Sequence, residues 1–184
     1  HRLNTGRMAK LPKSSKEAFQ RGLIQVNPQR QASIGPRYRE LFETMSKDVT
    51  VGLCGQGADE LHAGYPRYRE LDSHRELIQS RLAAMNMERD LSMFDDLQKT
   101  LQFEMDEGQL SNFQLRLVDR HSMAHGLEIR VPFLGSAHLK TALTLPMYER
   151  LPSGARWGEE KKALRSAAAL TALPKEVVKR PKMP

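Results

Sequence analysis

The sequence lacks the features of membrane-spanning and disulfide-stabilised proteins. Its 184 residues include one cysteine, Cys54, which excludes an internal disulfide and a multi-cysteine metal site and indicates a reducing compartment. No apolar run approaches the roughly 18 residues that a membrane helix needs. Residues 1–10 are basic but lack the apolar core and cleavage site of a secretory signal. We therefore expect a cytoplasmic protein that does not associate with membranes.

Aromatic residues are also scarce, at 6% of the chain, although the formal net charge is +7. A single-stranded nucleic-acid site needs clustered cations and aromatic rings on which bases stack. The lysines and arginines are instead spread along the chain and mixed with acids, as in residues 66–81. We predict no nucleic-acid partner. The positive charge alone would allow a nucleic-acid-binding protein as an alternative. An affinity that does not change with salt concentration would exclude this alternative.

The hydrophobic pattern predicts a mostly helical chain. Residues 1–35 are polar and weakly periodic, and we expect them to be poorly structured, with a short helix around residues 16–21 at most. Pro36 suits a first helical position. Apolar residues at helical spacing, together with the positions of glycine and proline, predict several helices. One of them begins at a cap, Ser111 or Asn112, and ends at Gly126. The others cover residues 36–47, about 77–87, about 94–103, 137–145, 159–170 and 174–179.

One β-branched apolar run, residues 49–54, predicts a buried strand that contains Cys54. It leads directly into Gly55-Gln56-Gly57. A glycine-flanked loop lets backbone N–H groups approach an anion such as phosphate closely. A carboxylate beside phosphate needs a cation between them, so Asp59 is a candidate magnesium ligand. Alternatively, the acids at positions 59 and 60 simply favour a helix N-terminus.

Three blocks of sequence resemble the asparagine synthetase family. Residues 55–61, Gly-Gln-Gly-Ala-Asp-Glu-Leu, with Gly-Tyr at 64–65, are similar to the family motif Gly-Glu-Gly-(Ser/Ala)-Asp-Glu-Leu-Phe-Gly-Gly-Tyr. Residues 117–134 resemble its Asp-Arg-x-Ser-Met-Ala signature and the Arg-Val-Pro-Phe-Leu that follows. Residues 160–182 resemble its closing Lys-x-x-Leu-Arg, Leu-Pro and Arg-x-Lys pattern. Three blocks in the family's order are more specific than a glycine loop alone.

The resemblance implies an α/β fold: residues 36–184 would be the helix-rich C-terminal portion of an adenine nucleotide alpha-hydrolase-like domain, in a longer parent protein. Family members adenylate a carboxylate with MgATP, release pyrophosphate and let ammonia or an amine attack. The implied substrate is aspartate or an analogue, and the implied partners are the ATP-binding and glutaminase segments of the parent. The implied site comprises the loop Gly55, Gln56, Gly57 and Ala58 at the pyrophosphate, Asp59 on magnesium, and Lys182 with Gln56 at the reaction centre.

Several positions depart from the family pattern. Gln56 replaces a glutamate proposed to act as a base, and an amide cannot take up a proton at neutral pH. His62, Ala63 and Gly135 replace Phe, Gly and Asp. Asparagine synthesis remains the first hypothesis. The alternatives are a specialised amide ligase of the β-lactam synthetase or peptide cyclase type, and a non-catalytic scaffold that retains the fold.

The Ser-Gly-Gly-x-Asp-Ser loop that grips ATP phosphates in the family does not occur in the sequence. We therefore expect the chain by itself to be inactive. We also expect exposed apolar surface to make it unstable or self-associating.

The middle block carries charges and histidines that we expect to be structural. Glu128 and Arg130 lie among apolar residues, and charges are tolerated in an interior only when paired, so we predict buried ion pairs there. His121 and His125 are four residues apart, a spacing that metal ligands use on a helix. Without a third ligand nearby in sequence, ordinary packing or surface roles are expected for them, and likewise for His62 and His74.

Overall fold

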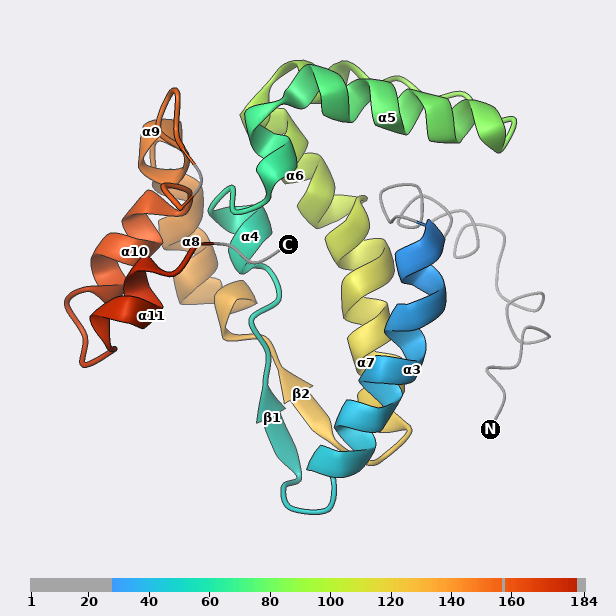
Figure 1. Ribbon diagram of the computed structural model, residues 1–184, viewed down its shortest axis with the longest axis vertical. Helices are drawn as coiled ribbons and strands as arrows, with labels where there is room; N and C mark the ends of the chain where they lie inside the picture. The colour runs from blue at the N-terminus through green and yellow to red at the C-terminus, as the bar shows by residue number, and fades with distance from the viewer. Residues whose placement is uncertain (1–27, 157, 182–184) are drawn as a thin grey trace. The chain divides into compact units, whose positions relative to one another are not determined.

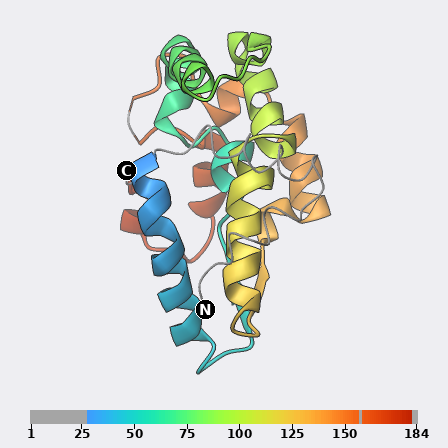
Figure 2. The same ribbon diagram turned by 90° about the vertical axis from the view of Figure 1, so that its right-hand side faces the viewer.

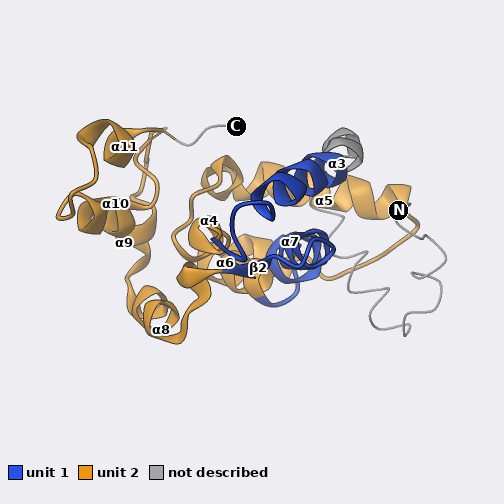
Figure 3. Ribbon diagram, turned by 90° about the horizontal axis from the view of Figure 1, so that it is seen from below, with its two compact units in different colours: residues 1–52, 106–130 blue, residues 53–105, 131–184 orange. Residues whose placement is uncertain are grey.

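The structure, a computed structural model, describes residues 28–156 and 158–181 (Figure 1). Most of this part of the chain is helical, and two short strands, β1 and β2, pair in parallel. The chain divides into two compact units, unit 1 (His1–Gly52 and Asp106–Arg130) and unit 2 (Leu53–Met105 and Val131–Pro184) (Figure 3). The predicted helix-rich α/β character is confirmed at this level.

Unit 1 is organised around two helices that lie side by side, α3 and α7 (Figures 1 and 2). Their shared core consists of Phe42, Val118 and Leu127, all buried, with partly buried apolar side chains packed around it. Gly126 has a φ of +67° in the turn after α7, a conformation that suits glycine. The elements of this unit are α3 (Pro28–Met45), most of β1 (Val51–Leu53), a π-helical turn η3 (Leu110–Gln114), α7 (Leu115–Met123) and β2 (Glu128–Arg130).

Unit 2 contains the remaining helices and most of the buried charge. Its apolar cluster combines Ala63, Tyr68 and Leu101, with four partly buried apolar residues against it. The elements are α4 (Ala58–Leu61), η1 (Pro66–Arg69), α5 (Leu71–Ala84), η2 (Ser92–Asp95), most of α6 (Leu97–Asp106), η4 (Pro132–Leu134), α8 (Ser136–Thr144), α9 (Met147–Arg150), α10 (Lys162–Ala168) and α11 (Lys175–Lys179).

Helix existence is predicted well and helix boundaries less well. Pro36 does not begin its helix, because α3 begins at Pro28 and contains Pro36 in its interior. An interior proline removes one hydrogen bond and does not always end a helix. Ser111 and Asn112 are not caps either: both lie in η3, which runs directly into α7. The Nδ2 of Asn112 donates instead to the Glu107 carbonyl, at 2.5 Å.

The strand predictions need two corrections. The strand near residue 50 is shorter than expected and is not buried: it spans β1 only, where the Val51 and Leu53 side chains are exposed, the latter at 75%. Cys54 follows the strand and is half-buried. The second strand, β2, was not predicted. Its three residues include one apolar side chain, Ile129, between two charged ones, a pattern too short and polar to reveal a strand.

Some expectations fall outside what the structure describes. The short helix around residues 16–21 and the lysine at position 182 both lie in undescribed stretches. Within residues 28–156 and 158–181, no helix has the length and apolar character needed to cross a membrane.

Candidate magnesium and phosphate site

The predicted glycine loop follows β1 and turns sharply at Gly57. That residue has a φ of +91° immediately before α4. A Cβ added there would lie 2.4 Å from Cδ2 of Leu134, so both the backbone conformation and the available space require glycine. Gly55 is exposed, and a Cβ added to it would meet nothing within 4 Å. The backbone of residues 55–57 is therefore accessible on the Gly55 side and tightly packed at Gly57.

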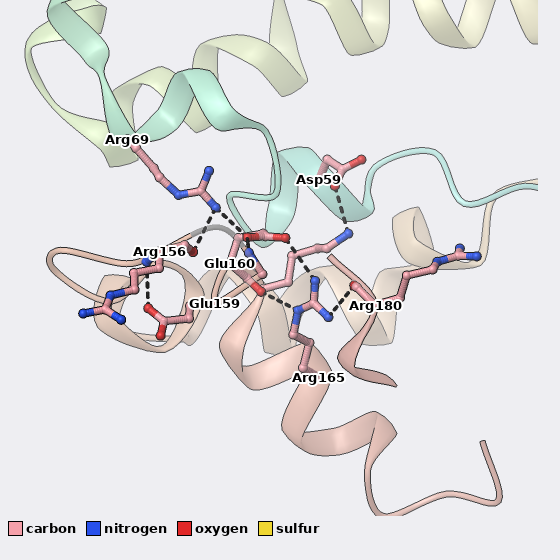
Figure 4. Close-up of polar contacts among 9 residues, drawn as sticks. Asp59, Arg69, Arg156, Glu159, Glu160, Arg165 and Arg180 are labelled. Carbon is pink, nitrogen blue, oxygen red and sulfur yellow. Dashed lines mark hydrogen bonds and ion pairs between the residues drawn. The ribbon is translucent and has the colours of Figure 1, made fainter. Parts of the chain in front are cut away.

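Asp59, in the first turn of α4, pairs with a lysine that lies 102 positions later in the chain. The Nζ of Lys161 donates to Oδ1 of Asp59 at 3.0 Å, and the two side chains are 19% and 15% exposed (Figure 4). Gly64 makes room for this pair: a Cβ there would lie 2.0 Å from Asp59 Oδ1 and 3.0 Å from Lys161 Cδ. Two segments distant in sequence, residues 59–64 and Lys161, thus meet at one partly solvated carboxylate.

This arrangement fits a magnesium ion that is shared with phosphate. Mg²⁺ usually keeps several waters and binds through one or two carboxylates plus substrate phosphates, not through a cage of protein ligands. Among the described residues, no group of three or more His, Cys, Asp or Glu side chains could hold a metal ion. Asp59 could supply one carboxylate to an ion of this kind.

Lys161 is held in an unusual backbone conformation. Its φ and ψ are +58° and +39°, the left-handed region, which non-glycine residues adopt at a cost of order 1 kcal/mol or more. The predicted helix over residues 159–170 is corrected here, since α10 begins only at Lys162 and Lys161 is its N-cap residue. The lysine therefore leaves the turn in a direction that a regular helical start would not give it.

The residue before it, Glu160, is completely buried and accepts several hydrogen bonds. Arg69 and Arg165 donate to its carboxylate from different elements, and the Gly158 N–H donates to Oε2 at 2.8 Å (Figure 4). We call these four residues the Glu160 cluster. Burial alone would raise the pKa of Glu160, but these hydrogen bonds and the nearby guanidinium charge outweigh it and hold the pKa below its ordinary value.

Arg165 also connects this turn to the end of α11. Its Nε donates to the Glu160 carbonyl at 2.8 Å, and one terminal nitrogen donates to the Arg180 carbonyl at 2.9 Å (Figure 4). The same nitrogen donates to the Val178 carbonyl at 2.7 Å. Arg180 is two positions before Lys182 in the sequence. The predicted catalytic role of Lys182 stays a prediction, since that residue lies outside the described part of the chain.

Two ionisable side chains that follow Asp59 in the sequence are buried. Glu60 is 1% exposed and accepts a hydrogen bond from the Tyr65 hydroxyl at 3.1 Å; burial is the main cause that raises its pKa to about 7. His62 is 2% exposed, and its Nε2 lies 3.0 Å from Nε2 of His138. Burial, followed by the charge of His138, lowers the pKa of His62 to about 4. The neutral form of each side chain is thus favoured by its surroundings.

The expectations for the middle block are partly wrong. Glu128 and Arg130 do pair, at 2.8 Å, but the side chains are 58% and 63% exposed, so the pair is on the surface. The reason is that β2 exposes both of its charged side chains. His121 is a packing residue, 7% exposed, as expected. His74 is also buried, beside Glu104, and desolvation lowers its pKa to about 3.

Sequence reasoning gave no role to Lys161 or Glu160, although both belong to the third block of resemblance. Their spacing from Asp59 carries no signal, because only the fold brings positions 59 and 161 together. The available hint was local: two adjacent acids followed by two adjacent lysines, at residues 159–162, immediately before a helix. Gln56 is half-buried in the loop, and its predicted role at the reaction centre remains a prediction.

Comparisons with known proteins identify the family of the chain. Residues 31–184 match the family described as Asparagine synthase. The chain is 32% identical over 152 residues to a Gallus gallus protein named asparagine synthetase [glutamine-hydrolyzing], and 31% and 30% identical to the proteins of that name from Homo sapiens and Mus musculus. Each alignment covers 82% of this chain but only 23% of the relative. The chain belongs to the asparagine synthase family.

Proposed function

We propose that this chain supplies the magnesium- and pyrophosphate-contacting part of an ATP-dependent amide-forming ligase. The observation that carries the proposal is the pair of Asp59 and Lys161, which places a carboxylate and an ammonium 3.0 Å apart beside the glycine loop. A carboxylate can hold Mg²⁺, and an ammonium can neutralise a phosphate oxygen. A metal ligand and a cation that neutralises phosphate are both needed where pyrophosphate leaves a nucleotide.

The proposed reaction has two balanced steps. A substrate carboxylate oxygen attacks the α-phosphorus of ATP, the bond from that phosphorus to the bridging oxygen breaks, and pyrophosphate leaves with the electron pair. The amine nitrogen then attacks the acyl carbon, AMP leaves, and the nitrogen loses a proton. When bound, magnesium would stabilise negative charge on the phosphate oxygens.

The chain's own residues would act mainly by position and charge. Asp59 would hold the metal ion, and Lys161 would exchange its bond to Asp59 for a bond to a departing phosphate oxygen. The exposed backbone around Gly55 would approach the same group without a side chain in the way. In phosphoryl and adenylyl chemistry such positioning and electrostatic stabilisation make up most of the catalysis.

The first candidate substrate is aspartate, with ammonia or glutamine as the nitrogen source, by analogy with the names of the relatives. Gln56 supports a second candidate, a ligase that joins another carboxylate and amine. At position 56 an amide cannot accept the proton that a glutamate could, so the amine must lose its proton to another group.

The test is carried out on the protein expressed from its complete gene, supplied with MgATP. Pyrophosphate release is measured with aspartate and ammonia or glutamine, and the amide product is identified by mass. Equal amounts of asparagine and pyrophosphate would support the first candidate. Pyrophosphate release only with other carboxylates would support the second, and no release with any carboxylate and amine would contradict the proposal.

A matched pair of lysines makes the test specific to the site. Lys161→Met should reduce pyrophosphate release by about two orders of magnitude, because it removes a charge that stabilises the leaving group. Lys162→Met is the control: the Nζ of Lys162 bonds Glu149 at 2.9 Å, and both side chains are substantially exposed. Equal losses in the two variants would mean that Lys161 has no special role.

A further inference from the structure

The Glu160 cluster lies directly before the lysine on which the proposed function depends. Glu160 has no exposed surface, whereas its sequence neighbour Glu159 is exposed and accepts a hydrogen bond from the backbone N–H of Arg156 at 2.7 Å (Figure 4). Burying a carboxylate against two guanidinium groups contributes little net stability, since desolvation offsets most of the attraction. A buried cluster of this kind is better explained by the geometry that it imposes.

That geometry is the left-handed backbone of Lys161. The cluster fixes the turn at four points: the Glu160 carboxylate receives Arg69, Arg165 and the Gly158 N–H, while the Glu160 carbonyl receives Nε of Arg165. A non-glycine residue stays in the left-handed region only when its surroundings over-determine that conformation. The fixed turn then directs the Lys161 side chain to Asp59.

We propose that Glu160, with Arg69 and Arg165, is a positioning residue that holds Lys161 in its left-handed conformation so that the ammonium reaches Asp59 and the phosphate bound there. The role of the cluster in phosphate binding rests on the proposed function, whereas its role in positioning Lys161 rests on the geometry alone. In metalloproteins, residues that hydrogen-bond to a metal ligand orient that ligand in the same way. Loss of such a residue typically weakens metal binding by about 10- to 100-fold.

The binding test uses the protein expressed from its complete gene, with magnesium pyrophosphate as the probe and calorimetry as the readout. Glu160→Gln should weaken binding about tenfold, because an amide cannot hold two guanidinium groups. Glu159→Gln, the matched control, should change binding by less than about twofold, since that side chain is exposed. Arg165→Lys keeps the charge but cannot reproduce the several bonds of the guanidinium, so it should also weaken binding about tenfold.

A double variant separates positioning from general damage. If Glu160 acts through Lys161, adding Glu160→Gln to Lys161→Met should cause no further loss of affinity, because the two residues share one effect. Additive losses would overturn the proposal. If Glu160→Gln does not fold, as judged by its NMR spectrum, Arg165→Lys takes its place. It is then combined with Lys161→Met, and the losses of affinity are compared in the same way.

A second measurement does not depend on any ligand. The left-handed backbone of Lys161 gives a strong contact between its own amide and Hα protons in NMR spectra. This contact should be present in the unmodified chain and in Glu159→Gln, and should weaken in Glu160→Gln or Arg165→Lys. If it persists unchanged in both of the last two, the positioning role is refuted, even where pyrophosphate binding is lost. If the unmodified chain shows the contact but binds no magnesium pyrophosphate, only the proposed function fails.

Discussion

The two units bury different kinds of side chain. The core of unit 1 is apolar, formed by Phe42, Val118 and Leu127, and the ion pair of Glu128 and Arg130 in this unit is exposed. Unit 2 has an apolar cluster too, but it also buries several ionisable side chains, which are Glu60, His62, His74, Glu104, Arg150 and Glu160. His121 is the one histidine that is buried in the part of unit 1 that the structure describes. In the described residues of unit 1, no acidic side chain and no arginine is buried. Unit 2 is also where Asp59 and Lys161 meet.

This difference separates what stabilises a fold from what positions chemistry. Apolar burial stabilises without fixing the orientation of any polar group, at about 25 cal/mol for each Å² removed from water. Buried charges contribute little net stability, but they tolerate only the few arrangements in which every charge is paired. The charged interior of unit 2 is therefore expected to be sensitive to loss of single partners and to pH, whereas unit 1 should be sensitive mainly to loss of volume.

The largest expected effect is a cavity in the core of unit 1. Phe42→Ala should lower the free energy of unfolding by about 4 kcal/mol, because the side chain is 4% exposed and its removal leaves a void. The measurement is urea unfolding followed by far-ultraviolet circular dichroism. The neighbouring Leu41→Ala is the control, since Leu41 is 50% exposed and its truncation should cost less than about 1 kcal/mol. Similar losses at both positions would contradict the assigned core.

The next effect tests the charged interior of unit 2. Glu104 is fully buried and pairs with Arg67 at 3.0 Å, so Glu104→Ala leaves a largely buried guanidinium without this partner and should cost about 3 kcal/mol. Glu128→Ala breaks the exposed pair of unit 1 and should cost less than about 0.5 kcal/mol. Both values come from the same urea experiment. If the two variants were equally stable, the contrast between the units would be wrong.

A smaller effect should depend on pH. The pKa of Glu60 is raised from 4.5 to about 7, so the folded chain binds more protons at this side chain than the unfolded chain between these values. Glu60 therefore reduces stability as pH rises through this range, and its unfavourable contribution is complete above pH 7. Glu60→Gln can still accept the Tyr65 hydrogen bond but cannot ionise.

Relative to the unmodified chain, the Glu60→Gln variant should become more stable by roughly 2–3 kcal/mol between pH 4 and pH 8. Comparing the two proteins at each pH cancels the opposite contribution of His62 and His74, whose lowered pKa values make the folded chain less stable as pH falls below 6.5. Thermal unfolding across this pH range provides the measurement. A difference between the two proteins that does not change with pH would show that Glu60 titrates normally.

The smallest effect concerns the shape of the glycine loop. Gly57→Ala should cost about 1–2 kcal/mol, because it places a Cβ on a left-handed backbone and against Leu134. Gly55→Ala should be close to neutral, since a Cβ there meets nothing within 4 Å. Thermal unfolding of the two variants compares them directly. A larger loss at Gly55 than at Gly57 would mean that the loop is packed differently.

The sequence predicted features that depend on local pattern. The helical spacing of Tyr38, Leu41, Phe42 and Met45 predicted the helix over residues 36–47, and all of them except Leu41, which is 50% exposed, pack in the core of unit 1. The order of the three sequence blocks correctly indicated the family. Both are properties of consecutive residues, and neither requires knowledge of which distant segments meet.

What could not be predicted depends on contacts between distant positions. The partner of Asp59 is 102 residues away, and the burial of Glu160 but not Glu159 follows from where Arg69 and Arg165 lie. The strand at Val51 and Leu53 looked buried by composition, yet its burial depends on what packs against it. Such exposed apolar side chains also agree with the expectation of self-association, which stays a prediction.

If Asp59 and Lys161 form a magnesium and pyrophosphate site, the binding of pyrophosphate should depend on both the ion and the Asp59 carboxylate. The most direct measurement is calorimetric titration of pyrophosphate into the protein expressed from its complete gene, with and without Mg²⁺, in the unmodified protein and in Asp59→Asn. Binding should require Mg²⁺ and should weaken at least about tenfold in Asp59→Asn, because the amide is a poorer ligand for the ion. Binding of equal strength without Mg²⁺, or unchanged in Asp59→Asn, would contradict the proposed site.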